Sequence, residues 1–252
     1  MLGIFITARM GSCRLQNKHF SLFFEKKSLE ILIERIVTEF KEEIFNRSVL
    51  LVIVSGDKSL NSELEVFTSK YPLELFYGAD RNIPLRHSQA CKALSCSTVL
   101  AIDGDDILCC PKAMRLTYKS LLEGKELVKT VGLPLGMNSW GYSVEVLNRF
   151  EDYFSCKEIF ETGWGIVFKN ILEFNIYFET KFSEAIRATL DYKEDVLFFK
   201  SVFSRIPNWA SISTFDLCEK IIDLGLEDIN IEKNNIYWQN FISERKKEGI
   251  EV

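Results

Sequence analysis

The sequence predicts an α/β fold with a mainly parallel sheet. Over the first 125 residues, four short apolar runs rich in β-branched and aromatic residues alternate with longer segments of helical periodicity. Because this alternation is typical of βαβ units, consecutive strands are expected to lie parallel, with helices covering the sheet. Strands are expected at 3–7, 49–54, 73–77 and 98–103, and helices at 29–40, 61–70, 84–94 and 111–122.

The pattern becomes more mixed after Gly124. Ser28 and Asp191 precede helical runs at N-cap positions. Neither a linker nor an internal repeat divides the chain, so we expect one domain over residues 1–252, with a mixed excursion at about 125–182. In this second half, strands are expected at 127–131, 143–146 and 165–168, and helices at 192–204, 215–224 and 235–247.

Composition argues against several classes of protein. The net charge of −5 over 252 residues does not suit a general nucleic-acid-binding protein, which would be basic. No apolar run approaches the roughly 20 residues needed to span a bilayer, and the N-terminus lacks the basic region of a signal peptide. The seven cysteines are odd in number and form no C-x-x-C pair, which favours reduced thiols in a cytoplasmic protein.

The loop after the first strand is the most informative segment of the chain. It places Arg9, Arg14 and Lys18, together with Gly11 and Ser12, directly after a buried strand. Backbone N–H groups near a glycine can face phosphate oxygens while cations offset their charge. The spacing is not that of a Walker loop. A phosphate cradle and a basic surface loop are therefore the two interpretations of this segment.

A second candidate site follows the fourth strand, in Asp103-Gly104-Asp105-Asp106. Ligands of open α/β sheets bind beyond the carboxyl ends of the strands, where this segment is expected. Three carboxylates within four residues repel one another unless a cation or protons intervene. Carboxylates suit Mg²⁺, which usually also binds substrate phosphates. The alternative is a turn closed by side-chain hydrogen bonds.

Several segments resemble those of one enzyme family. Residues 8–18, Ala-Arg-Met-Gly-Ser-Cys-Arg-Leu-Gln-Asn-Lys, are similar to the nucleotide-binding signature A-R-x-G-S-x-R-L-P-x-K of the sugar-acid cytidylyltransferases, which activate neuraminate and 3-deoxy-manno-octulosonate. Residues 101–107 resemble their I-x-G-D-[DE]-P stretch, and residues 187–195 their R-x-T-[LV]-D-[TY]-x-E-D segment. The resemblance is strongest to the branch named for spore-coat polysaccharide biosynthesis. Gln16 and Ile107 stand where the family has proline.

The resemblance implies a Rossmann-like, three-layer nucleotide-diphospho-sugar transferase fold of the GT-A-like type. It also implies a catalytic set, in which Asp105 and Asp191 would hold a metal ion and Arg9, Arg14 and Lys18 would bind the β- and γ-phosphates. A loop at 78–86, similar to the family's G-x-x-x-[DN]-[VI]-L-x-R, would face the base and sugar. The expected nucleotide-binding residues are Ala8, Arg9, Gly11, Ser12, Lys18, Asp80 and Arg86, and the expected acceptor-binding residues are Glu145 and Trp140.

Local structure offers a second explanation for several of these residues. Asp191, with Glu194 three residues later, fits a capping box as well as a metal site. Asp195 is expected on the helix surface. Arg86 would otherwise form an ion pair on a helix face, and a tryptophan such as Trp140 more often packs in a core than on a sugar.

The function implied by the resemblance is Mg²⁺-dependent transfer of CMP from CTP to a sugar acid or phosphorylated acceptor, with release of pyrophosphate, in surface polysaccharide biosynthesis. A homodimer with contacts in the mixed excursion is also implied. The family's E-H-[VT]-T segment is missing, and residues 160–164 stand in its place. The sequence therefore does not identify the acceptor or the base of the nucleotide. The alternatives are a metal-dependent glycosyltransferase that binds a nucleotide sugar through Asp103 and Asp105, and a non-catalytic nucleotide-binding relative.

Overall fold

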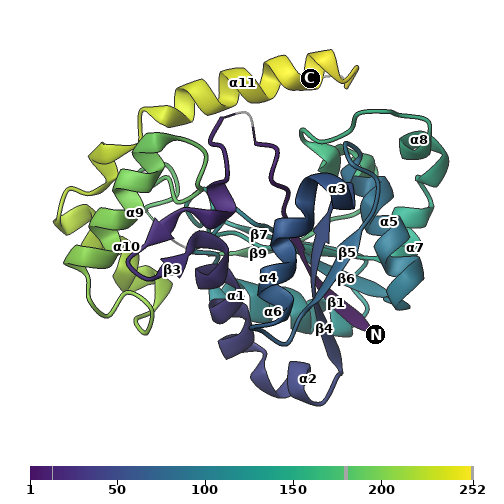
Figure 1. Ribbon diagram of the computed structural model, residues 1–252, viewed down its shortest axis with the longest axis horizontal. Coiled ribbons are helices and arrows are strands. Elements are labelled where there is room, and N and C mark those ends of the chain that lie inside the picture. Colours follow the sequence, from purple (N-terminus) through teal and green to yellow (C-terminus); the bar gives the residue numbers. More distant parts are fainter. Residues whose placement is uncertain (13, 179–180, 251–252) are drawn as a thin grey trace.

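A computed structural model describes residues 1–12, 14–178 and 181–250. Its centre is a seven-stranded sheet made of β1 (Leu2–Thr7), β4 (Val49–Ser55), β5 (Glu74–Tyr77), β6 (Thr98–Asp103), β7 (Leu127–Val131), β8 (Trp140–Ser143) and β9 (Phe174–Tyr177). The strand order is β5-β4-β1-β6-β8-β7-β9 (Figure 1). β1, β4, β5 and β6 are parallel, whereas β8 runs antiparallel to both β6 and β7. β9 is parallel to β7.

Helices cover both faces of this sheet (Figure 1). A two-stranded hairpin, β2 (Leu22–Phe23) and β3 (Lys26–Lys27), precedes the first of them. The α-helices are α1 (Ser28–Glu39), α2 (Lys41–Phe45), α3 (Lys58–Asn61), α4 (Glu65–Thr68), α5 (Ile83–Leu94), α6 (Pro111–Leu122), α7 (Val144–Asn148), α8 (Glu151–Ser155), α9 (Lys193–Arg205), α10 (Thr214–Asp223) and α11 (Lys233–Lys247), and the 3₁₀ helices are η1 (Lys18–Phe20), η2 (Ser62–Leu64), η3 (Trp164–Phe168) and η4 (Glu227–Ile229).

The core follows from the alternation of side chains along the strands. In β1, Ile4 and Ile6 belong to one buried cluster with Ile36 of α1, whereas Phe5 belongs to another with Ala90 of α5. A third cluster joins α9 and α10 to the segment that follows β6. The two clusters on opposite faces make three layers of helix, sheet and helix, which confirms the predicted α/β fold class.

The first half of the chain agrees closely with the prediction. The four expected strands are β1, β4, β5 and β6, and the helices expected at 29–40, 84–94 and 111–122 are α1, α5 and α6. The expected helix at 61–70 is instead divided among α3, η2 and α4. Ser28 is the first residue of α1 and not its N-cap, because Glu30 reaches back to the N–H of Lys27 (2.8 Å).

Two of the strands predicted in the mixed region were wrong. β8 ends at Ser143, whose Oγ accepts the N–H of Val146 (3.2 Å) and so begins α7. Residues 165–168 form part of the 3₁₀ helix η3, and β9 was not expected. The excursion at about 125–182 stays a prediction, and its residues 179 and 180 lie outside the described part of the chain.

Two findings bear on the expectations from composition. In the described part of the chain, no helix is both long and apolar enough to cross a membrane. The six cysteines described there are all free, and Cys13 lies outside the described residues.

Candidate active site

Three loops meet at the carboxyl ends of β1 and β6. The N–H of Gly104, after β6, donates to the carbonyl of Thr7 at the end of β1 (2.9 Å). The N–H of Leu190 donates to the carbonyl of Asp105 (3.0 Å), which fixes the segment before α9 beside the same loop. The parallel pairing of β1 and β6 thus aligns the sequence-distant loops that carry the predicted motifs.

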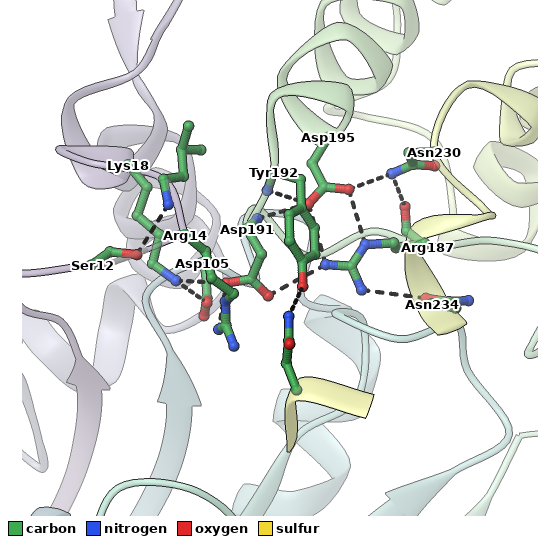
Figure 2. A network of polar contacts seen from close by, with 12 residues as sticks. Ser12, Arg14, Lys18, Asp105, Arg187, Asp191, Tyr192, Asp195, Asn230 and Asn234 are labelled. Carbon is green, nitrogen blue, oxygen red and sulfur yellow. Dashed lines mark hydrogen bonds and ion pairs between the residues drawn. The ribbon is translucent and has the colours of Figure 1, made fainter. Parts of the chain in front are cut away.

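Lys18 lies at the centre of this cluster (Figure 2). Its Nζ donates to Asp105 Oδ2 and to Asp191 Oδ1, the latter at 3.1 Å. Arg14 donates to the same Asp191 oxygen at 2.7 Å. The side chains of Lys18 and Asp191 are nearly buried, whereas Arg14 is partly exposed. The structure therefore brings together all the predicted catalytic residues except Arg9.

The charges of this cluster stabilise one another. Burial by itself would raise the pKa of Asp191, but the charges of Lys18 and Arg14 outweigh it and hold this pKa well below its usual range. The carboxylates of Asp105 and Asp191 likewise raise the pKa of Lys18 against the effect of burial. The side chain of Asp103 is exposed, but the protein that surrounds it and the charge of Asp105 raise its pKa to about 7.

Asp105 and Asp191 are the residues that could hold a divalent cation. Both contact one cationic atom, Lys18 Nζ, so a single positive charge fits between them. Mg²⁺ in proteins is usually bound by one or two carboxylates together with substrate phosphates and water. Among the described residues, no group of three or more acidic, histidine or cysteine side chains forms a metal site. Phosphate oxygens of a nucleotide would therefore have to complete the coordination.

A buried ion-pair network positions Asp191 (Figure 2). Arg187, whose side chain is fully buried, donates to Asp195 (2.9 and 3.2 Å) and to Asp191 (3.3 Å). Asp195 also accepts the N–H groups of Asp191 and Tyr192, each at 2.8 Å, and the side-chain amide of Asn230 at 2.8 Å. The network thus fixes the backbone from which the Asp191 carboxylate projects.

Two predictions for this segment were wrong. Asp195 is fully buried and does not lie on the helix surface. The N-cap of α9 is Tyr192 and not Asp191, and Asp195 at the third helical position reaches back to the Tyr192 N–H. The reason is that the Asp191 carboxylate turns toward the cations of the loop, while Glu194 pairs with Lys233 (3.0 Å).

Arg9 lies at the other end of the loop and forms a separate ion pair. Its guanidinium donates to Glu161 (3.0 Å), and Arg81 approaches the same carboxylate oxygen at 3.7 Å. The segment is held in turn by Glu248, whose carboxylate accepts the N–H of Glu161 (2.9 Å). Burial raises the pKa of Glu161 above its usual value, against the lowering effect of Arg9 and Arg81. Arg9, which was predicted to bind phosphate, is therefore paired in this structure with the carboxylate of Glu161.

Ala8, Gly11 and Ser12 lie in the loop between these two groups. The N–H of Ala8 donates to the end of β4 (3.3 Å), and Ser12 Oγ accepts the N–H of Leu15 (3.4 Å). Among described atoms, a Cβ added at Gly11 would meet only the Arg9 guanidinium, at 3.9 Å. The backbone at this glycine is thus open to a ligand.

Arg86 and Asp80 organise the loop that follows β5. Arg86 is almost fully buried, and it donates to the carbonyls of Ala79 (2.8 Å) and Asp80. Burial lowers the pKa of Arg86 to about 10. Asp80 Oδ1 accepts the N–H of Asp57 (3.3 Å). The guanidinium therefore shapes the loop through backbone carbonyls, and direct nucleotide binding by Asp80 and Arg86 stays a prediction.

Trp140 lines a pocket of about 320 Å³, together with Asp106 and Lys129. Asp106 directly follows Asp105, so the pocket adjoins the charged cluster. Glu145, the other predicted acceptor residue, does not line it. It is exposed on α7 and pairs with Arg149 (3.4 Å).

Three contacts in this region were not predicted from the sequence. Glu161 partners Arg9, Asn230 partners Asp195, and Tyr237 of α11 lies over Arg14, with 5.6 Å from the guanidinium carbon to the ring centroid. Asn230 and Tyr237 belong to segments without a family motif, whereas Glu161 lies in residues 160–164, which stand in the place of the family's E-H-[VT]-T segment.

Comparison with known proteins supports the resemblance. No family model matches the chain. It is similar to the spore coat polysaccharide biosynthesis protein SpsF of Bacillus subtilis, with 22% identity over 223 residues that cover 84% of this chain and 90% of SpsF. It is also similar to the uncharacterized protein MJ1063 of Methanocaldococcus jannaschii, with 26% identity over 200 residues covering 77% and 79% of the two chains.

Solved structures share its architecture. A cytidylyltransferase from Leptospira borgpetersenii superposes with a TM-score of 0.74 and 22% identity, over 90% of this chain and 95% of that one. The chain shares the fold of that cytidylyltransferase. A CMP:2-keto-3-deoxy-manno-octonic acid synthetase complexed with CTP has this fold too, with a TM-score of 0.57 and 10% identity over 81% and 98% of the two chains. The resemblance and the Rossmann-like, three-layer fold that it implies are confirmed.

Proposed function

We propose that the protein is a cytidylyltransferase that transfers CMP from CTP to a sugar acid or a phosphorylated acceptor and releases pyrophosphate. The observation that carries this proposal is the cluster of Arg14, Lys18, Asp105 and Asp191 at the carboxyl ends of β1 and β6. Carboxylates that can share a cation lie there beside cations that can bind phosphate, and a metal-bound triphosphate requires both. The similarity to SpsF supports a role in surface polysaccharide biosynthesis.

In this proposal, phosphate oxygens replace carboxylates as partners of the loop cations. Arg9 would leave Glu161, and Arg14 and Lys18 would turn from their aspartates to the β- and γ-phosphates. Charge-assisted hydrogen bonds of this kind are among the strongest in proteins. Cations placed around the departing pyrophosphate stabilise the charge that develops on it, which is the main catalytic effect in phosphoryl transfer.

The reaction forms one bond and breaks one bond at the α-phosphorus of CTP. An acceptor oxygen attacks this phosphorus, the bond to the bridging oxygen of the β-phosphate breaks, and pyrophosphate departs with the electron pair. The proton of the acceptor hydroxyl passes to solvent. Asp105 and Asp191 would hold Mg²⁺, and the bound ion would neutralise part of the phosphate charge.

The pocket beside the cluster is the proposed acceptor site. Trp140 supplies an aromatic face, which suits the apolar face of a sugar ring. Lys129, whose ammonium is paired with Glu173 at the rim, can approach a carboxylate or phosphate of the acceptor. The base and ribose of CTP would lie against the loop organised by Asp80 and Arg86.

Turnover of α-labelled CTP with a panel of sugar acids and sugar phosphates tests the proposal. The variants are Asp105→Asn and Asp191→Asn, and the control is Asp223→Asn, an exposed carboxylate at the end of α10. We expect one pyrophosphate per labelled product for wild type and control, and a loss of roughly a hundredfold or more in the two site variants. Consumption of a nucleotide sugar in place of CTP would instead support a glycosyltransferase.

We also propose that the protein forms a homodimer through the excursion at about 125–182. β9 lies at the edge of the sheet, where Leu172 and Tyr177 are strongly exposed. Light scattering is expected to give twice the chain mass for wild type and the single-chain mass for Tyr177→Arg. A single-chain mass for wild type at micromolar concentration would contradict the dimer.

A further inference from the structure

We propose that Tyr237, on the C-terminal helix α11, is a positioning residue that holds the phosphate-binding Arg14 and its neighbour Arg187 in place. This inference rests on the proposed function. The ring centroid lies 5.6 Å from the guanidinium carbon of Arg14 and 5.1 Å from that of Arg187. Both arginines donate to Asp191, at 2.7 and 3.3 Å. One aromatic ring therefore supports two cations that converge on one carboxylate.

The surroundings of the ring strengthen this contact. Tyr237 is half-buried, and Arg187 is fully buried. An aromatic face attracts a cation more strongly when water is excluded from the pair. Burial and the charges of Asp191 and Asp105 raise the pKa of the Tyr237 hydroxyl, so the side chain stays neutral and acts through its ring.

α11 is held across the site by contacts at both ends, which fixes the register of Tyr237. In Figure 1 the helix runs from the side of α9 to the side of α8. Near its start, Asn234 accepts from Arg187 (3.3 Å), and just after its end Glu248 accepts the N–H of Glu161 (2.9 Å). None of its 15 residues is fully buried, so polar and aromatic contacts hold the helix in place.

The positioning role of Tyr237 follows from the number of rotamers that the Arg14 side chain could otherwise adopt. Its side chain is partly exposed, and Arg14 itself belongs to neither a helix nor a strand. Without the ring, the guanidinium would gain rotamers that point to solvent, and each would have to be given up when a phosphate binds. The ring thus keeps Arg14 beside Asp191, where a triphosphate would have to lie.

Calorimetric titration with CTP and Mg²⁺ tests this role in Tyr237→Ala and in the conservative variant Tyr237→Phe. The matched control is Ile242→Ala, which removes an exposed apolar side chain from the same helix. We expect Tyr237→Ala to weaken CTP binding roughly tenfold. Tyr237→Phe should recover binding to within about threefold of wild type, because it keeps the ring. The control should bind as wild type, and thermal melting should show all variants folded.

Each outcome decides for or against the inference. Wild-type affinity in Tyr237→Ala overturns it, and so does equal weakening in Tyr237→Phe, since the hydroxyl would then be the acting group. If wild type binds no triphosphate, the proposed function fails. The side-chain Nε–Hε signals of Arg14 and Arg187 then test the contact itself. Ring-current shifts that vanish in Tyr237→Ala and persist in Tyr237→Phe support the positioning, and signals unchanged by both variants contradict it.

Discussion

Replacement of Arg187 by methionine is expected to destabilise the fold strongly. The guanidinium is fully buried and pairs with Asp195 (2.9 Å) and Asp191 (3.3 Å). Methionine fills much of the volume but leaves the Asp195 carboxylate buried without its cation. Breaking a buried pair in this way costs about 3–5 kcal/mol. At about 2–4 °C per kcal/mol for a chain of this size, the melting temperature should fall by roughly 6–20 °C.

Urea unfolding followed by tryptophan fluorescence measures this loss. Arg149→Met is the control, because Arg149 pairs with Glu126 and Glu145 at the exposed surface, where solvent screens the charges and their loss should change the stability little. Adding Asp195→Asn to Arg187→Met removes the unpaired charge and should recover part of the loss. If the single variant unfolds within about 1 kcal/mol of wild type, the argument that this network positions the site is refuted.

Three further predictions concern charge and pH. Lys18→Met leaves the two carboxylates that it joins without their shared cation and should weaken CTP binding at least tenfold by calorimetry, whereas unchanged affinity would contradict its phosphate role. Glu161→Gln removes the charge that pairs with Arg9 and should strengthen CTP binding by roughly two- to fivefold. Weaker CTP binding by this variant would contradict the prediction. Burial lowers the pKa of His19 and His87 to about 3, below the ordinary value of about 6.5. Neither ring should therefore titrate between pH 8 and 5 by NMR, and the stability from burying them neutral should be lost as pH falls from about 6.5 toward 3. A midpoint near pH 6.5 would contradict this.

The parallel half of the fold was predictable because three of its four strands, β1, β4 and β6, are buried on both faces. The segments at 49–54 and 98–103 are short, apolar and bounded by polar residues, so periodicity alone locates them. β8 and β9 have only four residues each, with mixed polarity, and their pairing depends on neighbours far along the chain. Ser143 gave a local signal, since a serine before an apolar run fits an N-cap as well as a strand residue.

The candidate site was predictable where a loop follows a strand directly. The parallel register of β1 and β6 brings the loop at 8–18 to the aspartates after β6. Asp191 and Asp195 were harder to assign, because either can cap the same helix. Both are buried, and only the positions of Arg187 and of the loop cations decide which carboxylate accepts the backbone N–H groups and which faces the loop. Tyr237 lies on a helix with no apolar stripe, so nothing in its own segment indicates what it faces.

Calorimetric titration of wild type and Asp105→Ala with CTP, ATP, GTP and UTP in the presence of Mg²⁺ is the decisive experiment on the proposed nucleotide site. We expect wild type to bind CTP selectively and Asp105→Ala to bind it more weakly, since Asp105 is proposed to hold the cation that the triphosphate requires. Binding of none of the four nucleotides by a folded wild-type protein would contradict it.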